Sequence, residues 1–186
     1  MTSRTAVSDP PTSFPIAAPI SAVHWLNTPE PLTLARLRGR VVVLHAFQML
    51  CPGCVSHGLP QAAEIQRLFK PSEVAVLGLH SVFEHHEAMT PVALRAFVHE
   101  YRLTFPIAVD QPSGTQSLPQ TMLAYGMKGT PTLVLIDRCG RRRSQHFGVV
   151  DDLRVGAEIG RLLTEPDQSA TRDDSASLSP PRHGGC

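Results

Sequence analysis

The feature that most constrains the fold is a pair of cysteines placed directly after a long apolar run. Residues 40–47 (RVVVLHAF) form a continuous run rich in β-branched side chains, which is typical of a strand buried on both faces of a parallel sheet. Cys51, Pro52, Gly53 and Cys54 follow this run, and from Cys54 onward apolar side chains recur at helical spacing. We therefore expect the two cysteines at the point where a buried strand ends and a helix begins.

This position gives the two sulfurs different chemistry. A cysteine attacks as its thiolate, and the unpaired N–H groups of a helix N-terminus lower an ordinary thiol pKa of about 8.5 by about one unit or more. Cys51 is expected to be the exposed nucleophile, and Cys54, one helical turn on, to face inward and resolve a mixed disulfide. Pro52 fixes φ and removes one amide that could donate to a sulfur, while Gly53 adds no side chain to screen the site.

Two other interpretations of a Cys-x-x-Cys pair are a zinc site and incidental core cysteines. A structural zinc site needs two further Cys or His ligands, usually as a second pair. Cys139 and Cys186 are far apart in the sequence, so redox chemistry is favoured over zinc. Cys139 is expected at a hairpin turn as an incidental thiol. Cys186 is either an idle thiol or, through a long tail, a partner of Cys51 in a mixed disulfide.

Length, charge and composition limit the class of protein. The 186 residues have a net charge of +1, 42% hydrophobic and 18% charged side chains, which fits one globular domain without a nucleic-acid or membrane-surface partner. Residues 1–20 contain no apolar stretch after a basic start, and no apolar run is long enough to cross a bilayer. The expected compartment is therefore the cytoplasm, where thiols are kept reduced. The one basic run, residues 141–143, is expected to be a solvated hairpin turn.

The chain divides into an arm, a domain and a tail. Residues 1–19 are rich in Pro, Ser and Thr and residues 165–186 are polar, so both are expected to be disordered. Residues 20–164 are expected to form one α/β domain with strands at 21–26, 40–47, 73–79, 105–109, 132–136 and 142–147 and helices at 54–69, 90–101, 118–125 and 153–163. This order implies a central mixed β-sheet flanked by helices on both faces.

Two stretches resemble the thioredoxin-like superfamily. They are residues 41–54 (VVVLHAFQMLCPGC) and residues 129–137 (GTPTLVLID), supported by residues 105–110 and 124–126. The sequence is most similar to the TlpA/ResA-type and redoxin (AhpC/TSA-like) branch, over roughly residues 20–163. The resemblance implies a thioredoxin-like fold and a thiol–disulfide oxidoreductase that acts on disulfide- or dithiol-containing proteins and is served by an electron donor. We expect no cofactor, no metal and a monomer.

The resemblance also implies roles for residues outside the cysteine pair. Thr130–Pro131 is implied to be a cis peptide bond that faces the disulfide, with the Thr130 backbone beside Cys51 and paired with an extended segment of the substrate. A trans proline that starts an edge strand is the alternative. The family commonly has an aromatic residue before the first cysteine, where this chain has Leu50, so the docking surface is expected to differ.

His45 stands six positions before Cys51, where the family often has a buried Asp, Asn or Glu under the resolving cysteine. A neutral imidazole there can accept the proton of Cys54, since its ordinary pKa of about 6.5 lies in the working range. A core histidine with satisfied hydrogen bonds is the alternative. Pro60 should kink the helix at 54–69, slightly farther from Cys54 than the family proline.

Other histidines are candidates for metal ligands or for electrostatic partners of a thiolate. His80, Glu84, His85, His86, Glu87 and His99 form a dense region after the second buried strand. They lack a clean helical face for a metal, so a polar rim or substrate-contacting loop is favoured over a metal site. His57 is either a partner of a nearby thiolate or a surface residue.

Two rival functions remain open at this point. Peroxiredoxins in the redoxin branch use a Pro-x-x-x-Thr/Ser-x-x-Cys loop, but Gln48 stands where the hydroxyl is needed before Cys51. This substitution counts against a thiol-dependent peroxidase. The third candidate is a non-enzymatic thioredoxin-like module for redox sensing or docking, in which the cysteine pair reports the state of the cell.

Overall fold

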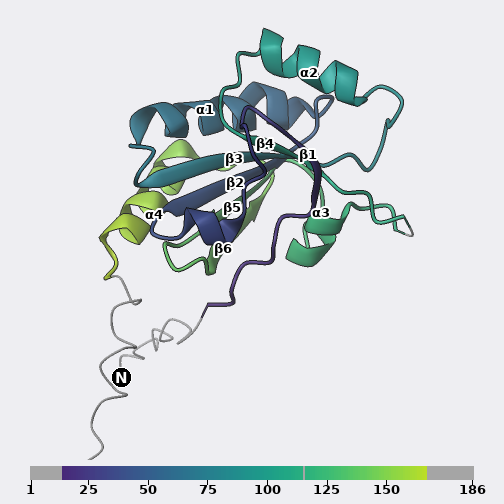
Figure 1. Ribbon diagram of the computed structural model, residues 1–186. Coiled ribbons are helices and arrows are strands. Elements are labelled where there is room, and N and C mark those ends of the chain that lie inside the picture. The colour runs from purple at the N-terminus through teal and green to yellow at the C-terminus, as the bar shows by residue number, and fades with distance from the viewer. Residues whose placement is uncertain (1–13, 115, 167–186) are drawn as a thin grey trace, which may run out of the picture.

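The computed structural model describes residues 14–114 and 116–166 and contains one six-stranded sheet in the order β1-β4-β3-β2-β5-β6 (Figure 1). Strands β2, β3 and β4 are parallel to one another, while β1, β5 and β6 each run antiparallel to a neighbour. The predicted mixed sheet is confirmed. The strands are β1 Ala22–Leu26, β2 Val41–Phe47, β3 Val74–His80, β4 Ile107–Asp110, β5 Thr132–Ile136 and β6 Arg142–Phe147.

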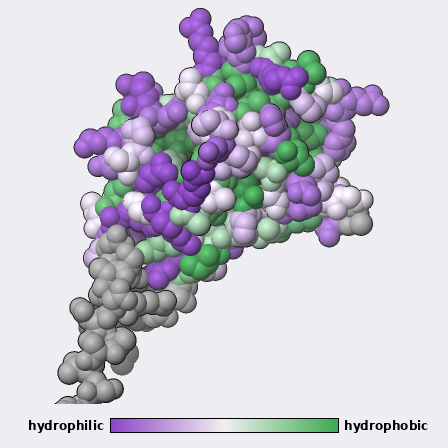
Figure 2. Space-filling view, in the orientation of Figure 1, coloured by the Kyte–Doolittle hydropathy of each residue, from purple (hydrophilic) through white to green (hydrophobic). Residues whose placement is uncertain are grey.

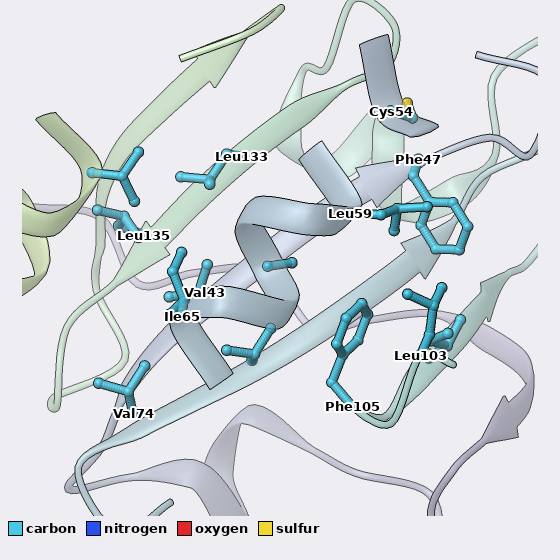
Figure 3. Packing of buried hydrophobic residues seen from close by; sticks show 14 of the residues in the cluster. Val43, Phe47, Cys54, Leu59, Ile65, Val74, Leu103, Phe105, Leu133 and Leu135 are labelled. Carbon is cyan, nitrogen blue, oxygen red and sulfur yellow. The ribbon is translucent and has the colours of Figure 1, made fainter. Parts of the chain in front are cut away.

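Helices cover both faces of this sheet, as the order of elements predicts. Because neighbouring strand residues point to opposite faces, the fully buried β2 sends Val43 and Phe47 into one apolar cluster and Val42 and Leu44 into another. The first cluster is closed by α1, α2 and α4 and the second by α3 and η1. Figure 3 shows Leu59 and Ile65 of α1 packed over strand residues of the first cluster. The helical segments are η1 Leu34–Leu37, η2 Cys54–Gly58, α1 Leu59–Leu68, α2 Pro91–Glu100, α3 Gln120–Tyr125 and α4 Asp152–Thr164.

The predicted helix at residues 54–69 is one continuous run of helical backbone that contains a π-helical turn. Residues Cys54–Gly58 form a π-helical turn, η2, and α1 begins only at Leu59. Pro60 is the second residue of α1 and lies inside this continuous run of helical backbone, so its missing N–H removes one intrahelical hydrogen bond next to η2. The irregularity therefore lies before Pro60, within the turn that carries Cys54.

Part of the predicted disordered arm is ordered. Ile16 forms an antiparallel bridge with Arg141, and the Ala17 N–H donates to the Gly140 carbonyl at 2.9 Å. Ala17 is buried in the cluster that α3 covers. The boundary at residue 19 was wrong for residues 14–19 because small apolar side chains between the prolines can line the edge of a sheet. The predictions for residues 1–13 and for residues 167–186, which include Cys186, lie outside the described residues.

The basic run at residues 141–143 is not a solvated turn. Arg142 and Arg143 belong to β6, and the Arg143 side chain is 10% exposed. Its guanidinium pairs with Asp137 at 3.3 Å and with Glu165, the residue that caps the C-terminus of α4. Arg143 thus ties the β5–β6 hairpin to the last helix. No helix among the described residues is long and apolar enough to cross a membrane.

Candidate active site

The cysteine pair lies just beyond the C-terminal end of β2. Cys51 is half-buried, and Cys54 is fully buried at the start of η2, at one end of the apolar cluster that α1 covers (Figure 3). Both residues are thiols in this structure. The backbone N–H of Cys54 points at the Cys51 sulfur, with N and Sγ 3.3 Å apart.

Cys54 is held in its protonated form. Burial, with a contribution from the hydrogen bond to Cys51, raises the pKa of the Cys54 thiol to about 12. The backbone amide of Gln48 and the hydroxyl of Thr130 oppose this rise because both hydrogen-bond the same sulfur. The inner sulfur is therefore inert at neutral pH until a reaction at Cys51 changes its surroundings.

The Thr130–Pro131 peptide bond is cis and lies against the cysteine pair. The Pro131 Cδ atom is 3.3 Å from the position that a Cβ on Gly53 would occupy. The strand β5 that follows lies inside the sheet between β2 and β6, so the alternative of a trans proline that starts an edge strand does not hold. Thr130 lies near Cys54, whose pKa its hydroxyl lowers by hydrogen bonding, while its neighbour Pro131 packs on Gly53.

Exposed apolar side chains border this arrangement. Leu50 directly precedes Cys51 and is 57% exposed, and Pro52 is also exposed. Val149, which is 61% exposed, lies 3.6 Å from the position of a Cβ on Gly53. Figure 2 shows apolar patches among hydrophilic side chains on one face of the molecule. Exposure alone therefore does not distinguish Leu50, Pro52 and Val149 as candidates for partner contact, whereas their place in or next to the cysteine motif does. Val149 was missed from the sequence because it is nearly 100 positions from Cys51.

We call η2 and α1 together the active-site helix. His45 lies beneath it, against Gly58. Among the described residues neither ring nitrogen has a hydrogen-bond partner. Burial, and to a smaller extent His57, lowers the pKa of His45 to about 4. Burial raises the pKa of Cys54 and lowers that of His45, so both groups are neutral in the reduced protein and proton transfer from Cys54 to His45 is unfavourable.

The dense histidine region divides into a buried and an exposed part. His80 is 1% exposed and packs against the Phe47 ring, with centroids 5.3 Å apart, and burial lowers the pKa of His80 to about 4. It is a core residue, while Glu84, His85, His86, Glu87 and His99 are exposed. Within residues 14–114 and 116–166 no three side chains of the types that bind metals come together.

His57 contacts neither cysteine through a hydrogen bond in the described structure. Its Nε2 lies 2.8 Å from the carbonyl oxygen of Val150, in the segment that joins β6 to α4. Asp152 is 3.9 Å from the same nitrogen. His57 thus connects the active-site helix to a distant part of the chain, a link that neither sequence-based interpretation included.

Comparison with known proteins gives one family and two similar solved structures of high identity. Residues 15–154 match the family model described as Redoxin. The crystal structure of the thioredoxin-like superfamily protein SPOA0173 is 55% identical, with a TM-score of 0.80, over 83% of this chain and 99% of that chain. A thiol-disulfide isomerase from Corynebacterium glutamicum is 50% identical, with a TM-score of 0.78, over 82% of this chain and 97% of that one.

The curated relatives are more distant. Protein DipZ from Mycobacterium bovis is 28% identical over 174 residues, which are 87% of this chain but 24% of DipZ. The thiol-disulfide oxidoreductase ResA from Bacillus anthracis is 27% identical over 119 residues, covering 64% of this chain and 61% of ResA. This chain therefore spans about a quarter of the length of DipZ.

Proposed function

This chain belongs to the Redoxin family, and we propose that it is a thiol–disulfide oxidoreductase that exchanges its Cys51–Cys54 pair with disulfide-containing proteins. One observation carries the proposal: a half-buried sulfur that accepts a helical N–H has a buried thiol behind it and a cis-proline beside it. In this arrangement the Cys51 sulfur can reach a partner, and the buried Cys54 sulfur lies behind it and can resolve the mixed disulfide.

In the reductive direction, the Cys51 thiolate attacks one sulfur of a partner disulfide. The partner's second sulfur leaves as a thiolate, and a mixed disulfide joins Cys51 to the partner. Cys54 then loses its proton and attacks the Cys51 sulfur, so the partner leaves with both cysteines reduced and the enzyme keeps the disulfide. An electron donor must reduce that disulfide before the next cycle. The opposite direction uses the same steps in reverse.

The second step depends on how Cys54 loses its proton. With a pKa raised to about 12, the thiol needs local stabilisation of the anion. The Thr130 hydroxyl and the Gln48 amide provide it, because both hydrogen-bond the sulfur and favour the thiolate. Since His45 is a poor proton acceptor, the departing thiolate of the partner or water is the better base for this step.

Neither rival function is favoured by a specific observation. The peroxidase alternative needs a hydroxyl at position 48, where the structure has a Gln side chain that is 1% exposed. Stopped-flow mixing with hydrogen peroxide distinguishes it, because rapid formation of a sulfenic acid at Cys51 would support a peroxidase. A redox-sensing module would form the disulfide reversibly but would show almost no turnover with protein disulfides.

The proposal is tested by insulin reduction with dithiothreitol as the donor. Wild type is expected to accelerate the reaction, Cys51→Ser to abolish the acceleration, and Cys54→Ser to accumulate a mixed disulfide that mass spectrometry detects. Cys139→Ser is the matched control, since Cys139 lies in the turn before β6. Turnover that survives Cys51→Ser would rule the proposal out.

The remaining expectations about partners and place are part of the same proposal. The absence of nucleic-acid partners and of charged membrane surfaces as partners is supported by the near-neutral charge, and a monomer and a cytoplasmic location complete the proposal. Sedimentation analysis tests the monomer and cell fractionation the location. The electron donor is best sought by trapping, because Cys51 disulfide-linked to its reductant should accumulate in a donor variant that lacks its own resolving cysteine.

A further inference from the structure

The segment between β6 and α4, residues 148–151, joins the two halves of the active site. The Gly148 N–H donates to the Pro131 carbonyl at 2.8 Å, with Gly148 at φ +85°, a conformation that favours glycine. The next residue, Val149, packs toward Gly53 and extends into solvent. We call residues 148–151 the bridging loop, since they contact the cis-proline segment at one end and the active-site helix at the other.

Two side chains of the active-site helix hold the far end of this loop. The carbonyl oxygen of Val150 lies 2.8 Å from His57 Nε2 and accepts a hydrogen bond from Gln61 Nε2 at 3.0 Å. Gln61 also donates to Asp152 Oδ1 at 2.6 Å. Gln61 is 6% exposed, so these are contacts of a buried amide and not of a mobile surface side chain.

The chemistry of these contacts fixes the orientation of both side chains. A carbonyl oxygen only accepts, so His57 carries its proton on Nε2. Gln61 uses one N–H group of its amide on the loop and the other on Asp152, the first residue of α4, whereas its Oε1 has no partner among the described residues. Glutamate is isosteric but would place a carboxylate against one carbonyl and one carboxylate. Position 61 therefore requires a side chain with two N–H donors, as the glutamine amide has, for the Val150 carbonyl and the Asp152 carboxylate.

We propose that His57 and Gln61 are positioning residues that hold Val149 beside Gly53 in the cysteine motif, where Val149 selects partners with an apolar side chain next to their reacting cysteine. The inference rests on the proposed function and adds a preference for one class of substrate segment. Val149 is accessible to a partner because it is 61% exposed, and it lies next to Gly53 and Pro131, against which a partner must dock to reach Cys51.

A purely structural role for the same contacts makes a different prediction. Val150 is buried in the core cluster and α4 begins two residues later. If His57 and Gln61 only brace α4, removing their donors lowers stability but affects all substrates alike. If they position Val149, the removal changes the ratio of rates between an apolar and a polar substrate. The ratio therefore separates the two roles.

The experiment uses the full reduced chain and two synthetic peptides whose single cysteine is linked to thionitrobenzoate. The peptides differ only in the residue before the cysteine, which is Leu in one and Ser in the other. Attack by Cys51 forms a peptide–enzyme disulfide and releases coloured thionitrobenzoate, which stopped-flow absorbance records. Wild type is expected to react faster with the Leu peptide. Val149→Ser should lower the Leu-to-Ser rate ratio by about tenfold, and Gln61→Met by about threefold or more.

Matched variants control for folding and for the chemistry of the donor. Gln66 lies on α1 and accepts an exposed hydrogen bond from the Thr104 hydroxyl. Gln66→Met removes this bond and should leave the ratio unchanged. His57→Gln keeps an N–H donor and should keep the ratio, while His57→Leu should lower it. Thermal unfolding reports whether Gln61→Met is folded; His57 and Val149 are more exposed, so their variants test the inference independently.

Two results would overturn it. An unchanged ratio in Val149→Ser would show that Val149 does not select the substrate. A Gln61→Met variant that slows both peptides equally would assign Gln61 to bracing alone. Either result leaves the proposed function intact as long as Cys51→Ser abolishes thionitrobenzoate release, whereas release that survives Cys51→Ser would remove the proposed function itself.

Discussion

The imidazole of His45 lies 2.3 Å from the position that a Cβ atom on Gly58 would occupy. His45 belongs to β2 and Gly58 is the last residue of η2. The active-site helix therefore packs on this ring at a residue that has no side chain. Family members commonly have a carboxylate or amide at the position of His45. Here a larger, neutral ring takes that place and supports the turn that carries Cys54.

Gly58→Ala is expected to destabilise the protein by about 2–3 kcal/mol, because a methyl group overlaps a rigid ring in a packed core. Urea denaturation measures the effect. Gly160→Ala on α4 is the matched control, since its Cβ would meet no atom within 4 Å and alanine favours helix by about 1 kcal/mol.

The same contact predicts non-additivity. In a His45→Ala background the ring is gone, so adding Gly58→Ala should cost at least about 1 kcal/mol less than it does in wild type. Equal costs in both backgrounds would mean that the two residues do not meet, and the account of the π-helical turn would fail with them.

Acid is expected to destabilise the fold through its two buried histidines. Burial lowers the pKa of His45 and of His80 from 6.5 to about 4 in the folded state. Their contribution is therefore fully present above pH 6.5 and is lost as pH falls toward 4. Each histidine should cost up to about 3 kcal/mol at the acid end of this window.

Denaturation curves at several pH values between 4 and 8 measure this loss. His80→Phe removes one of the two titrating groups and should flatten the dependence, since Phe fills a similar space beside Phe47. His99→Gln, at an exposed position, should leave the curve unchanged. A wild-type stability that does not vary across this window would contradict the burial of both rings as neutral groups.

Thr130→Val is expected to slow resolution by about 3- to 10-fold, the range for one lost hydrogen bond. The Thr130 hydroxyl stabilises the Cys54 thiolate, so its loss should raise the pKa of Cys54 further. The lifetime of the mixed disulfide, followed by rapid acid quench and mass spectrometry, reports this step directly. Thr104→Val, far from the site on the loop before β4, is the control. A mixed disulfide that resolves at the wild-type rate would exclude this role.

Arg143→Met is expected to destabilise the fold by about 3 kcal/mol. It removes the partner of two carboxylates, Asp137 and Glu165, in an ion pair whose arginine is 10% exposed. The guanidinium holds the pKa of Glu165 below its usual range, so the loss should be largest above pH 5. Arg154→Met breaks an exposed pair with Glu158 and should cost less than about 1 kcal/mol. Similar losses in both variants would argue against the buried network.

The fold and the class of chemistry were predictable because both depend on local signals. The β-branched run, the Thr90 cap and the Pro91 start of α2 act within a few residues of one another. The thioredoxin-like fold and the redoxin branch are confirmed by the family match and the similar structures. The segment at residues 14–19 was misassigned because its order comes from pairing with Arg141, more than 100 positions away.

The surroundings of the two cysteines followed less readily from sequence. Spacing alone places Cys51 and Cys54 one turn apart at a helix start, and the structure adds which atoms face them. His57 was considered only as a thiolate partner or surface residue, yet its hydrogen-bonding partner, Val150, lies 93 positions away. The sequence pattern assigns Gln61 to a helix and gives it no further role. No neighbouring residue indicates that its amide donates to Val150 and Asp152, about 90 positions away.

The amino-acid sequence by itself determined the strand that ends before Cys51, the helix that begins at Cys54 and the redox chemistry of the pair, because periodicity and capping act over a few residues. Tertiary structure alone decided that a histidine supports the helix through Gly58, and that the loop between β6 and α4 places Val149 beside Gly53, between the two cysteines in sequence. Such contacts arise when the sheet brings residues far apart in sequence within a few ångström, and no local pattern encodes that distance.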